Sequence, residues 1–159
     1  MNYKDLTIKI IVTVVLFFTI NAINAQNSDS LRVKKFIEQG DKYRIEGEFE
    51  KAREYALKAL ELKPNYGLAY ILIGSIYVSS AELCGEEYLL KAIVYCLAVD
   101  MFEKAKEVDK SVSETADKFI EVYSRYFPSQ EDIFGGPREG DKFKIECWIN
   151  RETTVRYRR

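Results

Sequence analysis

The chain has 159 residues, enough for about one domain with a modest core. Its 24 basic and 25 acidic residues nearly cancel, so its net charge favours neither nucleic acid nor an anionic membrane surface as a partner. The sequence contains no histidine, which excludes Ser–His and Cys–His nucleophile pairs and the usual zinc sites. We therefore expect no enzymatic activity, no catalytic residues, no metal site and no cofactor.

The first 25 residues have the pattern of a signal peptide. Lys4 and Lys9 give a positive start, an apolar run covers 10–20, and Ala25 precedes the expected cleavage point. The run is shorter than the roughly 18 apolar residues of a membrane-spanning helix. We expect an exported protein, located in the periplasm or cell envelope after cleavage near Ala25. A retained membrane anchor formed by the same segment is the alternative.

Apolar residues then recur at helical spacing in five stretches of the chain. These stretches are 31–46, 48–64, 68–77, 88–108 and 112–127. The sequence SVSE, which opens the last stretch, has the form of a capping box, so Ser111 and Glu114 are expected to satisfy free amides at a helix start. The sequence thus predicts a mainly helical protein.

Near the C-terminus the period changes from helical to alternating. FKIECWI at 143–149 and TTVRYR at 153–158 each alternate apolar with polar residues. The linker GGPREGD at 135–141 precedes them. We predict a β-hairpin that packs on the helices, because an isolated hairpin is only marginally stable in water.

Small residues recur where helices would need to pack closely. Ala52, Ala56 and Ala59 lie on one face of the second helical stretch. Three residues of the first stretch return 34 positions later, since Phe36, Gly40 and Tyr43 correspond to Tyr70, Gly74 and Tyr77. The alanine spacing returns as Ala98, Phe102 and Ala105, which is 46 rather than 34 positions later. The second unit therefore carries an insertion near 79–91.

This spacing, with Gly47 at a turn and Pro64 at the end of the unit, resembles the tetratricopeptide repeat (TPR) family. The resemblance implies a short TPR-like α-solenoid of about two repeats plus a capping helix, closed by the C-terminal β-hairpin. It divides the chain into a signal peptide (1–25), a TPR-like helical domain (26–128) and a C-terminal turn and hairpin cap (129–159).

The arrangement as a whole resembles a group of small exported TPR proteins of the Bacteroidetes type. The matching residues are Cys84-Gly85, Phe127-Pro128, Ile133-Phe134 and the closing CWI…TTVR segment, which runs from Cys147 to Arg156. For this group the resemblance implies a fold and a compartment, and it implies no reaction.

Export would place three cysteines in an oxidising compartment. Cys96 lies within an apolar helical pattern and is expected to be a buried small hydrophobe. Cys84 lies in a turn-like stretch and Cys147 in a strand-like one, so these two are the candidate disulfide. The alternative is three free thiols.

In TPR proteins the first helix of each pair lines a concave groove, which is the first candidate binding surface. Its residues here, by helical spacing, are Lys34, Ile37, Asp41, Arg44, Leu68, Ile71, Ser75 and Val78. The Lys and Asn side chains with which some relatives hold a C-terminal carboxylate are replaced, so that clamp is not expected. The groove is either open to a partner or filled by the chain's own insertion or hairpin.

The hairpin face bearing Trp148, Arg156 and Arg158 is the second candidate partner-binding surface, because Trp and Arg are enriched among interface hot spots. The alternative is a solvated strand face with Trp148 lying on the helices.

We therefore predict an exported protein–protein interaction module with an unknown protein or peptide partner. No nucleic-acid partner is expected, and membrane contact is expected only if the N-terminal segment is retained. A membrane-anchored structural component of the envelope is the alternative function. A hydrolase acting through carboxylates is disfavoured, because the sequence has neither histidine nor a catalytic motif.

Overall fold

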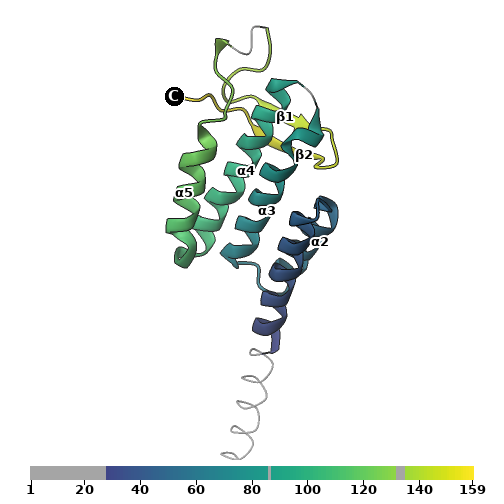
Figure 1. The fold of residues 1–159 in the computed structure, drawn as a ribbon. Helices are drawn as coiled ribbons and strands as arrows, with labels where there is room; N and C mark the ends of the chain where they lie inside the picture. The colour runs from purple at the N-terminus through teal and green to yellow at the C-terminus, as the bar shows by residue number, and fades with distance from the viewer. Residues whose placement is uncertain (1–27, 86, 132–134) are drawn as a thin grey trace, which may run out of the picture.

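A computed structural model describes residues 28–85, 87–131 and 135–159 (Figure 1). The predicted signal peptide over 1–25 and the Ile133-Phe134 pair lie outside the described residues.

The described chain is mainly helical, with a small antiparallel sheet near the C-terminus, which confirms the predicted fold class at this level. A helix covers 28–45 and is followed by α2 (Phe49–Leu62), α3 (Gly67–Ser80), α4 (Tyr88–Val108) and α5 (Ser113–Ser124). Short 3-10 turns, η1 (Ala81–Cys84) and η2 (Lys110–Val112), precede α4 and α5. Strands β1 (Lys142–Ile145) and β2 (Arg151–Thr154) lie at the end of the helical layer where α3 ends and α4 begins (Figure 1).

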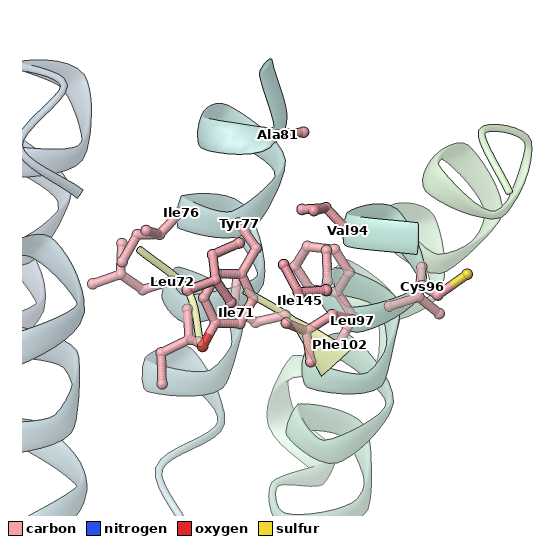
Figure 2. Close-up of a cluster of buried hydrophobic side chains, with 14 of the residues drawn as sticks. Ile71, Leu72, Ile76, Tyr77, Ala81, Val94, Cys96, Leu97, Phe102 and Ile145 are labelled. Atoms are coloured by element: carbon pink, nitrogen blue, oxygen red, sulfur yellow. The ribbon is translucent and has the colours of Figure 1, made fainter. Parts of the chain in front are cut away.

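The core lies mainly between α3 and α4. Side chains from both helices converge there, and Ile145 of β1 joins them (Figure 2). Helix α3 is apolar around most of its circumference because α2 covers one side and α4 another. Helix α2 is instead amphipathic, and its buried stripe consists of the three predicted alanines, Ala52, Ala56 and Ala59.

Two glycines mark the closest approach between neighbouring helices. A Cβ atom added to Gly74 would lie 2.5 Å from the ring of Phe102 on α4. One added to Gly40 would lie 2.9 Å from Cδ2 of Leu72 and 3.1 Å from the carbonyl oxygen of Ala52. These are the two glycines that the sequence pattern placed 34 positions apart, and both are needed for close helix contact.

The predicted hairpin forms, but its strands are shorter than expected. Lys142 pairs with Thr154 and Ile145 with Arg151, and the ladder does not continue into 147–149 or 155–158. The backbone at 148–149 turns instead, and its carbonyl oxygens accept hydrogen bonds from Arg53 of α2. An alternating pattern cannot reveal this, because the turn keeps Ile149 buried just as a strand would.

The predicted capping box does not form. Helix α5 begins at Ser113, and the Ser111 hydroxyl donates to Asp109 Oδ1 at 2.6 Å, while Glu114 pairs with Lys118. The hydrogen bond from Ser111 lowers the pKa of Asp109. The same carboxylate accepts from the Gly67 amide at 3.2 Å, so it joins the end of α4 to the start of α3.

A disulfide joins Cys84 of η1 to Cys147, with Cα atoms 5.1 Å apart, and closes a loop with a sequence separation of 63. Cys96 is a buried free thiol. Burial raises the pKa of Cys96 to about 11, so this thiol is neutral and poorly reactive at neutral pH.

Replacing Gly74 with alanine should destabilise the fold, although Gly→Ala within a helix ordinarily stabilises by about 0.5–1 kcal/mol. The new methyl group would overlap the buried Phe102 ring, so we expect a loss of about 1–3 kcal/mol in urea denaturation. Gly40→Ala is the matched control and should cost less, because the nearest atom is the end of the Leu72 side chain. A stabilised Gly74→Ala variant would contradict the close approach of α3 and α4.

Replacing both Cys84 and Cys147 with serine should lower the free energy of unfolding by up to about 4 kcal/mol, as the chain-entropy estimate gives for a loop of this length. Denaturation with and without a reductant measures the effect. The reductant should destabilise the native protein and leave the double variant unchanged.

Candidate functional site

The predicted groove face comes from the helix 28–45 and α3. Lys34 is exposed and Leu68 is 40% exposed, whereas Ile71 is buried in the core. The other five predicted residues are half-buried: Ile37, Asp41, Arg44, Ser75 and Val78. Only part of the predicted line is therefore available to a partner, and Ile71 is a core residue.

Arg44 connects the two helices of this face. Its Nε lies 2.8 Å from Oδ1 of Asp41, and its Nη1 donates to the Ser79 hydroxyl at 3.2 Å. The guanidinium and the carboxylate therefore hold each other in place beside α3. This part of the face is polar and ordered by internal contacts.

The hairpin packs on α2 and α4. Arg53 of α2 donates to the Ile149 carbonyl at 2.6 Å, and Asp100 of α4 accepts from the Thr153 hydroxyl at 2.6 Å. These are the second helices of the two predicted pairs. The hairpin thus contacts the second helix of each predicted pair, and Trp148 also contacts Tyr77 of α3.

Trp148 lies on the helices, which is where the second of the two sequence-based alternatives placed it. Its ring stacks on Phe49 with centroids 6.0 Å apart and contacts Tyr77 at 6.1 Å. The Arg53 guanidinium lies 4.8 Å from the ring centroid. The indole Nε1 is buried and makes no hydrogen bond within the described structure.

Beside Trp148 is a cavity of about 460 Å³. Its walls are the turn and first residues of α2, over 47–51, together with Leu83 and Trp148. Leu83 is 64% exposed, so its side chain is accessible at the edge of the cavity. We call this cavity the Trp148 pocket.

Arg156 is held by α4. Its guanidinium pairs with Asp100 and, at 2.8 Å, with Glu103, and it lies 5.6 Å from the centre of the Phe127 ring. These contacts tie the segment after β2 to α4 and to the chain just after α5. Arg156 therefore acts as a packing residue.

The structure does not bring the three predicted hairpin residues together. Trp148 lines its pocket at the start of α2, whereas Arg156 and Arg158 line a separate cavity of about 310 Å³ near the end of α5. Arg158 donates to the Tyr88 hydroxyl at 3.2 Å. The single binding face expected from the alternation is thus divided into two places.

Sequence reasoning missed the pocket walls Phe49 and Leu83 and the anchors Arg53 and Asp100. A signal for Leu83 was present, because it is the neighbour of Cys84 as Trp148 is of Cys147. A bridge between the two cysteines brings their neighbours together. No comparable signal marks Arg53, whose partners are backbone carbonyls 95 and 96 positions away.

Within the described ranges, His, Cys, Asp and Glu side chains form no group of three that could hold a metal ion. Among the same residues one segment, Gly67–Cys84, has the length and hydropathy of a membrane span. It consists of α3 and η1, and 56% of it is buried inside the protein, as is typical of a core helix.

Comparisons of the chain with family models, with curated proteins and with solved structures found no match.

A double-mutant cycle should separate the Asp100–Arg156 pair from an ordinary surface pair. We expect a coupling of about 1–2 kcal/mol from unfolding of Asp100→Ala, Arg156→Ala and the double variant, because both side chains are about three-quarters covered. The control is the exposed Glu121–Arg125 pair of α5, which should give about 0.2–0.5 kcal/mol. Equal coupling energies for the two pairs would contradict the anchoring role of Arg156.

Proposed function

We propose that the protein is an exported TPR-like module that binds a protein or peptide partner in the cell envelope. In this proposal the helix 28–45 with α2, and α3 with α4, are two successive repeats, and α5 is the capping helix. The face formed by the helix 28–45 and α3 is the partner-binding side.

The observation that carries the proposal is the position of the hairpin on α2 and α4. With anchors at Arg53 and Asp100 and a further contact of Trp148 with Tyr77, the hairpin covers the end of the helical layer where α3 ends and α4 begins (Figure 1). Lys34 and Leu68, which is near the start of α3, remain exposed. In this proposal Lys34 and Leu68 are the exposed positions at which a peptide or a protein helix makes contact.

The recurrence of close helix contacts at Gly40 and Gly74 supports the repeat interpretation. Each glycine lies in the first helix of its pair and faces the second helix of the same pair, at Ala52 and Phe102 respectively. Equivalent contacts at a 34-residue offset are what stacked helical hairpins require.

Crosslinked co-purification from the native envelope tests the proposal. One stoichiometric partner should be recovered with the native protein and lost with Lys34→Glu combined with Leu68→Asp. Leu57→Asp on α2 is the matched control, since Leu57 is also 40% exposed. If the control and the double variant lose the partner equally, the assigned face is wrong.

The N-terminus of the protein recovered from cells tests the compartment. We expect the chain to begin at Gln26, as cleavage after Ala25 predicts. A chain that still carries the apolar segment 10–20 would support the membrane-anchored alternative instead.

A further inference from the structure

The Trp148 pocket has the size and lining of a ligand site. Its volume of about 460 Å³ falls within the range of roughly 300–1,000 Å³ that is usual for ligand pockets. Phe49, Leu83 and Trp148 provide apolar walls. It lies at the start of α2 and is separate from the face formed by the helix 28–45 and α3.

The disulfide holds the two outer walls of the pocket together. Leu83 precedes Cys84 in the chain, and Trp148 follows Cys147. With the two Cα atoms of the bridge 5.1 Å apart, the adjacent walls are kept at a separation that neither η1 nor the hairpin turn sets alone. The pocket is therefore a product of the cross-link as well as of the helical packing.

One polar atom of Trp148 lacks a partner within the described structure. The indole Nε1 of Trp148 is buried without an acceptor, and burial of an unpaired donor is unfavourable. The Glu48 side chain caps no amide of α2. Because Nε1 is itself buried, it is not available to a ligand in the pocket, and the exposed side chain of Leu83 forms the outer wall.

The charge of the pocket rim is acidic once internal pairs are counted. Glu48 pairs with Lys51, and Glu46 lies 3.9 Å from Lys42. Glu50 lines the pocket and has no ion pair among the described residues. One uncompensated carboxylate therefore lies beside the apolar walls.

We propose that the Trp148 pocket binds a short peptide segment in which a large apolar side chain is followed by lysine or arginine. The apolar side chain occupies the space between Leu83 and Trp148. The basic side chain pairs with Glu50. This site is a second binding surface, separate from the proposed partner-binding face. The inference does not depend on that face.

The tryptophan gives a direct readout, because Trp148 is the one tryptophan in the chain. The probes are the blocked peptides acetyl-Gly-Leu-Lys-Gly-amide and acetyl-Gly-Leu-Glu-Gly-amide, titrated into the oxidised protein while tryptophan emission is recorded. We expect a saturable change with the lysine peptide and at least about fivefold weaker binding of the glutamate peptide.

Two pairs of variants locate the interaction. Glu50→Gln should abolish the preference for lysine, whereas Glu61→Gln at the other end of the same helix should keep it. Leu83→Ala should weaken binding of the lysine peptide about tenfold, whereas Leu31→Ala, at another exposed leucine, should leave it unchanged. All four side chains are exposed, so the fold should persist in each variant.

Reduction of the disulfide should weaken binding of the lysine peptide while the helical circular dichroism remains. The proposal is overturned if the lysine peptide produces no saturable change, if both peptides bind equally, or if Glu50→Gln has no effect. Lys34 and Leu68 lie outside the pocket. If the native protein captures an envelope partner but does not bind the lysine peptide, the inference about the Trp148 pocket is overturned and the proposed function is not.

Discussion

The contact between Gly74 and Phe102 sets the distance between α3 and α4, and the rest of the structure depends on that distance. The ring lies only 2.5 Å from where a Cβ atom would be, so the Phe102 side chain packs directly against the α3 backbone. The core residues on either side fill the space that this approach defines (Figure 2). A larger separation would leave voids among side chains that are now fully buried.

The hairpin supplies what so short a helical stack lacks. Two pairs of helices and one further helix bury a limited area, and small helical arrays need a cover over their remaining apolar surface. Here Ile145, Ile149 and Val155 enter the main core from the C-terminal segment. Arg53, Asp100 and the disulfide then fix that segment at three separate points, which makes the sheet part of the core despite its two short strands.

Periodicity predicted the helices well because their apolar faces are long. The buried alanines and the paired glycines were visible in the sequence because close packing admits few residue types at those positions. The hairpin turn was not, since Trp148 and Ile149 satisfy an alternating pattern while their carbonyls bond to a distant arginine. Contacts that join distant parts of the chain leave no local signature. The capping box failed for a different and local reason, because Asp109, two residues before Ser111, accepts from both its amide and its hydroxyl.

The candidate sites differ in how many of their residues could be predicted from the sequence. The predicted groove residues follow from helical spacing, but in the structure Ile71 is buried, most of the others are half-buried, and only Lys34 and Leu68 are exposed. The Trp148 pocket is assembled from the turn before α2, from η1 and from the hairpin turn, which no single periodic pattern describes. Its walls meet because a cross-link joins their neighbours, so its integrity is linked to an oxidising environment. Under the proposed export, the pocket is complete only once the disulfide has formed in an oxidising compartment.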